Sequence, residues 1–362
     1  MVAATADEQR EAFVGRLFEA TLGMFDLLCV YVGDQLGLYR ALADRGATTS
    51  QELATAAGIH ERYAREWLEQ QAMSGILEVD DAAAAAGERR YRLPAGVDEV
   101  LLDESSLYFG AALAQAAVAC ALPIHQLLDA FRTGDGVPYA DYGADLHEGQ
   151  ARFTRPMFEH LLSGWLGGTP QVHERLQADP PARVADVACG LGRSSLAIAI
   201  AYPKVRVDGI DLDEASIVRA KELLAGSGVE DRVSFRHADA ADVGFSQRYD
   251  VVTIFEALHD MSYPVHVLRS LRGMLAEGGS LIVGDERTAD KFSLDAGPVE
   301  RLYYGFSVMH CLPVGMVGKD PAGTGTVIRS DTVERYAREA GFAEFEVLPV
   351  ENDFWRFYRM SR

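Results

Sequence analysis

The sequence RVADVACGLGRSS, at residues 183–195, is the stretch from which the fold can be predicted. Its apolar residues at 184–188 predict a buried strand, and Gly190 and Gly192 predict a tight turn whose backbone takes positive φ. A helix is expected to begin at Arg193 and to continue through LAIAIAY. Because the first N–H groups of such a helix point at whatever lies above the turn, this unit predicts a ligand site.

An acidic residue ends the next predicted strand. The segment VRVDGID finishes at Asp211, 21 positions after Gly190, where a carboxylate can accept hydrogen bonds from ribose hydroxyls. The residues admit a nicotinamide dinucleotide or S-adenosylmethionine as the ligand, and a turn that binds nothing is the remaining alternative. Ser195 stands where a dinucleotide motif has its third glycine, which counts against a pyrophosphate.

The composition is that of a globular protein with room for two domains. The chain has 362 residues, of which 48% are hydrophobic and 24% charged. A formal net charge of −20 argues against a nucleic-acid partner, which needs a basic face. We expect no signal peptide, no membrane contact and no metal. Four cysteines without metal-ligand spacing favour free thiols in a reducing cytoplasm.

The first 105 residues predict a mostly α-helical, winged-helix domain. Helical periodicity covers residues 8–45, two short helices follow between 49 and 75, and segments 76–79 and 90–93 alternate like a hairpin. The second helix of such a unit can read DNA, but its charges here are mixed. We therefore favour dimerisation and closure of a substrate pocket. A ligand-sensing regulator is the alternative, which a salt-dependent gel shift would reveal.

Residues 106–178 are interpreted as a helical linker that contributes to a substrate pocket. An alanine-rich helix over 108–122 is expected to be buried between domains or protomers. The following segment carries Tyr142, and the helix EGQARFTRPMFEHLLSGWL carries Phe153, Met157 and Trp165. These side chains either line the pocket or form the packed face of an amphipathic linker helix.

Strands and helices alternate from residue 179 to residue 362. This order predicts an α/β domain with a Rossmann-like, doubly wound and mostly parallel sheet. Ligands of such sheets bind beyond the carboxyl ends of the strands. The residues expected to contact the cofactor gather at these ends: Asp186, Gly190, Gly192, Arg193, Asp211, Leu212, Asp239, Ala240, Phe255 and Glu256.

Several of these residues have a specific expected contact. Asp239 can accept a hydrogen bond from the adenine amino group and Ala240 can donate one to the ring, although a carboxylate at a strand end is often only a turn residue. Phe255 and Glu256 would lie beneath the sulfonium, where acceptor atoms suit a positive charge.

The candidate catalytic residues are His259, Asp260, Asp285 and Glu286. A neutral His259 imidazole at the mouth of the pocket could take a proton from an attacking hydroxyl. Asp260, or an acid from the pair Asp285 and Glu286 on the neighbouring strand, could orient the ring. In the alternative interpretation, His259 and Asp260 only cap the following helix.

Four motifs together resemble the class I S-adenosylmethionine-dependent methyltransferases over residues 180–360: DVACGLGRSS, GIDLD, HADAAD and EALHDMSYP. With the winged-helix N-terminus, the chain resembles the small-molecule O-methyltransferases that dimerise through that domain. This resemblance implies that His259 is the catalytic histidine and that Asp285 or Glu286 is the first assisting acid. The second would fall near residues 327–329, where the sequence has no acid.

A closer resemblance is to bacterial, largely actinobacterial, winged-helix methyltransferases of mostly unassigned substrate, through QARFTRPMFEHLL, YYGFSVMHCLP, GTGTVIR and FWRFYRM. It implies an acceptor pocket lined by Tyr142, Phe153, Met157, Trp165, Tyr303, Tyr304, Ser307 and His310. Tyr303, Phe306 and His310 have a second interpretation, as one packed face of a helix.

The sequence therefore predicts a homodimeric enzyme that transfers the methyl group of S-adenosylmethionine to a small, aromatic or apolar acceptor and releases S-adenosylhomocysteine. O-methylation is favoured, and N- or C-methylation is also open. The alternatives are a methyltransferase fold with non-methylating chemistry and the winged-helix regulator.

Overall fold

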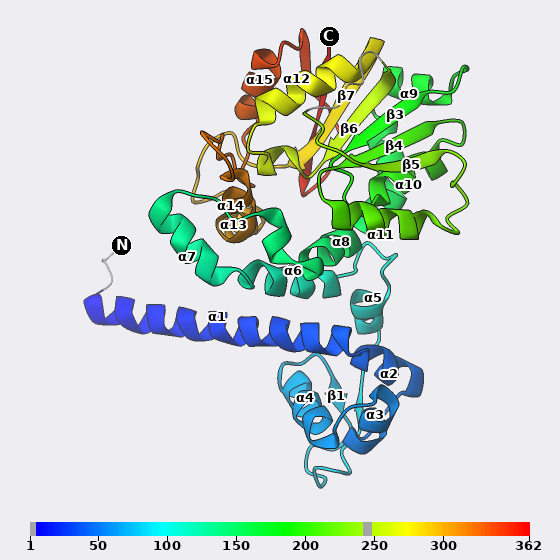
Figure 1. The fold of residues 1–362 in the computed structure, drawn as a ribbon. Helices are drawn as coiled ribbons and strands as arrows, with labels where there is room; N and C mark the ends of the chain where they lie inside the picture. The colour runs from blue at the N-terminus through cyan, green and yellow to red at the C-terminus, as the bar shows by residue number, and fades with distance from the viewer. Residues whose placement is uncertain (1–4, 242–247) are drawn as a thin grey trace. The chain divides into compact units, whose positions relative to one another are not determined.

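The computed structural model describes residues 5–241 and 248–362, which form two compact units, 1–118 and 119–362 (Figure 1). Asp242, the last residue of the HADAAD motif, lies outside the described residues. The division into residues 1–105, 106–178 and 179–362 stays a prediction.

The first unit has the helices and the hairpin that the sequence predicts. Its elements are α1 (Ala6–Gln35), α2 (Leu38–Arg45), α3 (Ser50–Ala57), α4 (Glu61–Met73), β1 (Glu78–Val79), β2 (Tyr91–Arg92) and α5 (Val97–Leu102). The segment 8–45 is two helices because Gly37 takes a left-handed φ of 66° between them. Strands β1 and β2 pair antiparallel as the wing.

Arginines of the wing and of α4 are paired with carboxylates of the same unit. Their nitrogen–oxygen distances run from 2.5 to 3.4 Å: Arg62–Glu66, Arg65–Glu61, Arg89–Glu69, Arg90–Glu52 and Arg92–Glu78. Neutralised side chains of this kind do not make the basic stripe that binding to phosphates requires.

The second unit is built on a seven-stranded sheet in the order β5-β4-β3-β6-β7-β9-β8. Its strands are β3 (Arg183–Val187), β4 (Arg206–Asp211), β5 (Val233–His237), β6 (Tyr249–Phe255), β7 (Leu275–Glu286), β8 (Glu344–Val347) and β9 (Trp355–Ser361). The first five are parallel, and β9 runs antiparallel to both β7 and β8. The predicted α/β class with a mostly parallel sheet is confirmed.

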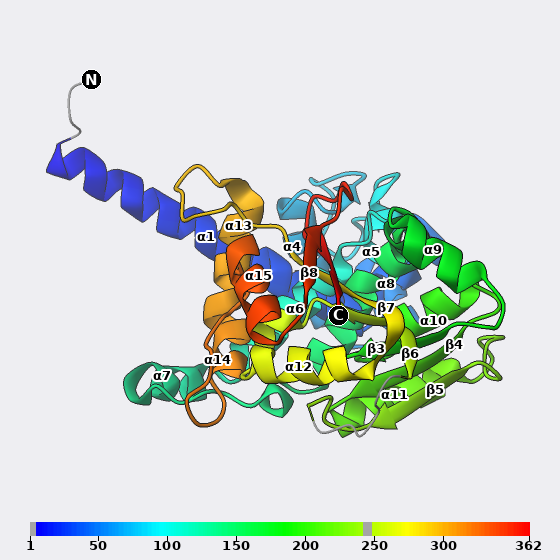
Figure 2. The ribbon, with the colours of Figure 1, turned by 90° about the horizontal axis from the view of Figure 1, so that it is seen from above.

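Helices cover both faces of this sheet (Figures 1 and 2). On one face a core forms with α8 (Ala144–Gly167), α9 (Pro170–Gln177), α10 (Arg193–Ala201) and α11 (Glu214–Leu224). On the other face, α12 (Pro264–Met274) and α15 (Ser330–Glu339) bury their apolar side chains. This arrangement leaves the carboxyl ends of the parallel strands open between the layers.

Shorter elements complete the chain: α6 (Ala111–Ala121), α7 (Ile124–Thr133), η1 (Tyr139–Tyr142), η2 (Leu258–Asp260), α13 (Gly297–Phe306), η3 (Ser307–Cys311) and α14 (Leu312–Gly315). The alanine side chains of α6 are largely buried, as predicted. Within the described residues, no single helix has the length and apolar content to cross a membrane. Only α6 and α7 pass that test together, as a pair bent by 55°.

Candidate active site

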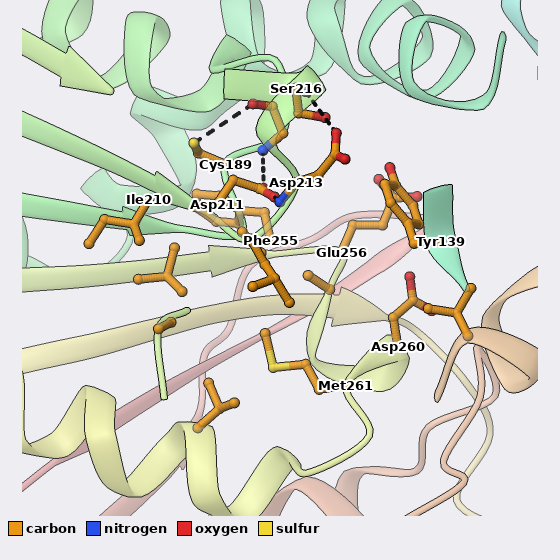
Figure 3. A pocket seen from close by; sticks show the side chains of 18 of the residues that line it. Tyr139, Cys189, Ile210, Asp211, Asp213, Ser216, Phe255, Glu256, Asp260 and Met261 are labelled. Atoms are coloured by element: carbon orange, nitrogen blue, oxygen red, sulfur yellow. Dashed lines mark hydrogen bonds between the residues drawn. The ribbon is translucent and has the colours of Figure 1, made fainter. Parts of the chain in front are cut away.

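A cavity of about 780 Å³ opens at the carboxyl ends of β3, β4 and β6. Eight of the ten predicted cofactor residues line it: Gly190, Arg193, Asp211, Leu212, Asp239, Ala240, Phe255 and Glu256. Figure 3 shows Tyr139, Glu256 and Asp260 on one side of the cavity and Ile210 on the opposite side. The sequence prediction that a pocket forms at the strand ends agrees with this position.

The glycine turn is held from below by a buried carboxylate. Asp186 accepts hydrogen bonds from the hydroxyl groups of Ser194 (2.5 Å), Ser195 (2.6 Å) and Thr253 (2.7 Å). It is 1% exposed and does not line the cavity. Ser195, which replaces the third glycine of a dinucleotide motif, therefore fixes the turn to the end of β3.

The two glycines of the turn have different surroundings. Gly190 (φ 50°) lines the cavity, and a Cβ added to it would meet no atom within 4 Å. Gly192 (φ 76°) does not line the cavity, because it packs against the ring of Phe235. Of the two glycines, Gly190 is thus the one whose backbone a ligand in the cavity can approach.

Asp211 reaches the cavity from the end of β4. Its Oδ2 accepts the N–H of Gly190 at 2.7 Å, and its Oδ1 accepts the N–H of Asp213 at 2.8 Å. Burial raises the pKa of Asp211, and these two backbone donors oppose that rise. The carboxylate is thus fixed in orientation at the position expected to meet a ribose.

The residues after β5 form the predicted adenine end. Asp239 and Ala240 line the cavity. Asp239 Oδ1 also accepts the N–H of Ala241 at 2.8 Å, so the carboxylate closes a local turn as well. Leu212, Phe255 and Met261 supply apolar walls.

His259 lies in a cluster of carboxylates. Its Nδ1 is 2.7 Å from Asp285 Oδ1 and 2.8 Å from Glu286 Oε2, and its Nε2 is 3.1 Å from Asp260 Oδ1. Asp285 and Glu286, the two residues predicted to include the first assisting acid, thus both contact the same ring nitrogen. The atoms of the cluster are also close enough to hold a cation, but these contacts account for their geometry, and the absence of a metal stays a prediction.

The cluster sets the charges of its members. Burial alone would lower the pKa of His259, but the carboxylates of Glu286, Asp260 and Asp285 raise it well above its ordinary value. Burial would raise the pKa of Asp285, but His259 lowers it to about 2. Burial raises the pKa of Glu286 well above its ordinary value. The neighbouring carboxylates thus favour the protonated form of His259, and His259 in turn favours the ionised form of Asp285.

His259 does not lie at the mouth of the pocket, where the sequence predicted a neutral imidazole. Its side chain is 2% exposed and does not line the cavity, and its role as the base stays a prediction. Asp285 and Glu286 are buried behind it. Asp260 does line the cavity. Asp285 orients the ring, as one of the predicted arrangements required.

The eight residues predicted to form the acceptor pocket do not line the cavity. Met157 and Trp165 belong to the core, Phe153 packs edge-to-face against Phe354, and Tyr304 contacts Arg329. The hydroxyl groups of Tyr142 and Tyr303 donate to the backbone carbonyls of Met309 and Phe354. Ser307 and His310 are buried with Tyr303, as in the packed-face interpretation.

A neighbouring face of α8 lines the cavity instead. The residues are His147, Gln150, Ala151, Thr154 and Phe158, which recur at helical spacing. Tyr139 of η1 joins them and stacks on the ring of His147 with ring centroids 4.7 Å apart. Gln150 and Phe158 belong to the segment for which the sequence leaves pocket lining and packing open, whereas His147, Ala151 and Thr154 were not predicted, although their helical spacing is readable in the sequence.

Comparison with known proteins identifies two domains. Residues 178–330 match the family model described as a methyltransferase domain, and residues 25–102 match the Rv2258c-like winged HTH domain. The second unit of the chain thus contains a methyltransferase domain, and the first unit contains an Rv2258c-like winged helix-turn-helix domain.

Relatives of this kind act on small molecules. The 27-O-demethylrifamycin SV methyltransferase of Amycolatopsis mediterranei is 32% identical over 160 residues, which are 44% of this chain and 53% of that protein. This chain thus spans about half the length of that curated relative. Human N-acetylserotonin methyltransferase, solved with S-adenosylmethionine, has a TM-score of 0.69 at 15% identity and covers 100% of this chain and 99% of its own.

An O-methyltransferase from neocarzinostatin biosynthesis was solved with S-adenosylhomocysteine and 1,4-dihydroxy-2-naphthoic acid. It has a TM-score of 0.64 at 18% identity, covering 93% of this chain and 95% of its own. At these identities the solved structures show the shared fold.

Proposed function

We propose that the protein transfers a methyl group from S-adenosylmethionine to a small acceptor. A hydroxyl acceptor with aromatic or apolar character is favoured, and a nitrogen or carbon acceptor remains possible. The observation that carries this proposal is the shared cavity of Gly190, Asp211, Asp239 and Phe255 at the strand ends. The relatives named for rifamycin and N-acetylserotonin support a small-molecule acceptor.

The residues present fit the methyl donor. The open space above Gly190 admits a ligand against the backbone, and the buried Asp211 carboxylate suits a pair of ribose hydroxyls. S-adenosylmethionine brings a methyl group that its sulfonium already activates. The chain then has to align the acceptor, exclude water and manage one proton.

The regulator alternative has less support. The wing and α4 carry arginines that are paired with carboxylates, and the net charge is −20. The non-methylating alternative keeps the same donor site and differs only in the acceptor chemistry.

Calorimetric titration with S-adenosylmethionine and S-adenosylhomocysteine tests the proposal. We expect both to bind and Asp211→Ala to weaken binding by about 10- to 100-fold, because a hydrogen bond to a charged group is worth about 1.5–3 kcal/mol. Asp331→Ala on the remote helix α15 is the matched control and should bind like the wild type. Failure of the folded wild type to bind either compound would contradict the proposal.

We also propose a homodimer in the cytoplasm. Large apolar side chains along α1 are exposed, with Phe13, Leu17 and Phe18 between 54% and 63%. A helix with such a surface needs a partner, and a second copy of the chain supplies one. All four cysteines are free thiols, which supports a reducing compartment.

A further inference from the structure

Two carboxylates reach one side of the cavity from a single turn. Glu256 follows β6 directly, Asp260 ends η2, and both line the cavity (Figure 3). His259, which lies between them in the sequence, is buried behind the side of the cavity that they form. A molecule placed above Phe255 would therefore meet carboxylates.

The backbone of Glu256 is held in an unusual conformation. Its φ is 51°, a left-handed value that a residue with a side chain seldom adopts and that persists only where the surrounding structure enforces it. The N–H of Glu256 donates to the carbonyl of Gly284 on β7 at 2.8 Å, which fixes the turn. The carboxylate lies close to Tyr139 of η1 and Gln150 of α8, which also line the cavity.

The ionisable groups around Glu256 either have hydrogen-bond or ion-pair partners of their own or keep their protons. Asp260 is paired with the His259 imidazolium, and this pairing lowers its pKa against the effect of burial. Burial raises the pKa of Tyr139, so its phenol keeps its proton. The Tyr303 hydroxyl of α13 donates to the Phe354 carbonyl. Asp285 of β7 is bonded to His259.

His147 is the imidazole that lines the cavity from α8. Its Nδ1 lies 3.5 Å from Asp213, next to Asp211, on the β4 side where the ribose is expected. Glu256 is thus the cavity-lining carboxylate next to Phe255. Arg193 of α10 and His266 of α12 line the same cavity, and the charge of His259 acts on Glu256 from behind the cavity wall.

We propose that Glu256, rather than His259, accepts the proton of a hydroxyl acceptor. This inference rests on the proposed methyl transfer. The acceptor O–H bond breaks and its proton passes to the Glu256 carboxylate. The pair left on oxygen forms the bond to the methyl carbon, while the carbon–sulfur pair leaves with sulfur. His259 is a positioning residue that holds Asp260 and the turn.

Burial prepares Glu256 for this role. Burial raises its pKa to about 7, a rise that Asp260 and Asp285 reinforce and that His259 and Gln150 oppose. A base is most effective when its pKa lies near the working pH. Above pH 7 the carboxylate is ionised and ready to accept a proton.

The first test needs no acceptor. The full chain, labelled with ¹³C at the glutamate carboxyl and saturated with S-adenosylhomocysteine, is titrated by NMR. We expect a signal with a pKa near 7 that is missing in Glu256→Gln, whereas the raised signal of Glu286 stays in that variant. Titration of Glu256 at the ordinary glutamate pKa would overturn the inference. Failure of the wild type to bind S-adenosylhomocysteine would count against the proposed function instead.

The second test follows turnover of 1,4-dihydroxy-2-naphthoic acid as a probe acceptor against pH. In the wild type, kcat should rise through about pH 7. Glu256→Gln should lower kcat by about 100-fold or more, change KM little and abolish that rise. His259→Gln should keep the rise, and Glu334→Gln on α15 should match the wild type. A rise that persists in Glu256→Gln and disappears in His259→Gln would overturn the inference. If the probe is not methylated, the NMR titration decides.

Discussion

Replacing Gly192 by alanine is expected to destabilise the fold, whereas replacing Gly190 by alanine is expected to weaken binding of the methyl donor. An alanine Cβ at position 192 would lie 2.5 Å from Phe235 Cε1 and 3.3 Å from Ala220 Cβ. Phe235 is 7% exposed and packed in the core, so its ring has no space into which to move. At position 190 the same methyl group meets no atom within 4 Å and enters the cavity.

The expected magnitudes follow from these contacts. A left-handed φ costs a residue with a side chain about 1–2 kcal/mol, and overpacking of a core costs about 1–3 kcal/mol more. Gly192→Ala should therefore lower the free energy of unfolding by about 2–5 kcal/mol. Gly190→Ala should lower it by about 1–2 kcal/mol but reduce affinity for S-adenosylhomocysteine by about 10-fold or more.

Urea unfolding followed by circular dichroism measures the stability, and calorimetry measures binding. Gly226→Ala is the matched control, because Gly226 has a φ of 79°, has no atom within 4 Å of an added Cβ and does not line the cavity. It should show the strain alone, with unchanged binding. Equal unfolding midpoints for Gly192→Ala and Gly190→Ala would refute this assignment of the two glycines.

Two further predictions concern the charge cluster and α1. Because the folded pKa of His259 lies above its ordinary value of 6.5, its contribution to stability is complete below pH 6.5 and is lost as the pH rises through the folded pKa. Urea unfolding on both sides of this range should show that loss in the wild type but not in His259→Gln, and an equal loss in both would contradict it. In sedimentation experiments, the wild type should be a dimer, and Leu17→Glu with Phe18→Glu should shift it to monomers. Glu19→Gln on the same helix is the control, and a monomeric wild type would contradict the dimer.

The parallel sheet, and the position of the cavity at the carboxyl ends of its strands, could be predicted from the sequence, because the apolar strands and the helix caps are recognisable locally. Helix α11 begins at Glu214 because the Asp213 carboxylate caps it, accepting the N–H of Ser216 at 2.7 Å. Strand β7 begins at Leu275, and its pairing with β6 shifts register between Tyr249 and Val251.

The acceptor side could not be predicted because a helical pattern does not specify which apolar face meets a cavity. In α8, Phe153 and Met157 were chosen, and the adjacent Thr154 and Phe158 line the cavity. One residue along a helix is a rotation of about 100°. Some large side chains of this helix pack in the core and others line the cavity, so the size and polarity of a residue do not predict which of the two it does.

The histidine cluster shows a second limit of sequence reasoning. The motif brought His259, Asp260, Asp285 and Glu286 together, and the structure places them in contact. The strained turn after β6 determines which member of the cluster faces the cavity. No local sequence pattern predicts that turn. Ala188 after β3 and Glu256 after β6 both take positive φ, at the ends of paired neighbouring strands.

The backbone strain at these two residues lies directly beside the expected donor site and the proposed base. Each costs of the order of 1–3 kcal/mol, and the pairing of β3, β6 and β7 compensates for that cost. After β3, the strain leads the chain into the glycine turn that would hold the donor. After β6, it brings Glu256 to the cavity wall and leaves His259 behind it. The donor site and the proposed base thus each follow a left-handed residue at the end of a strand. Because β3 and β6 are paired, this arrangement fixes the position of the donor site relative to the base.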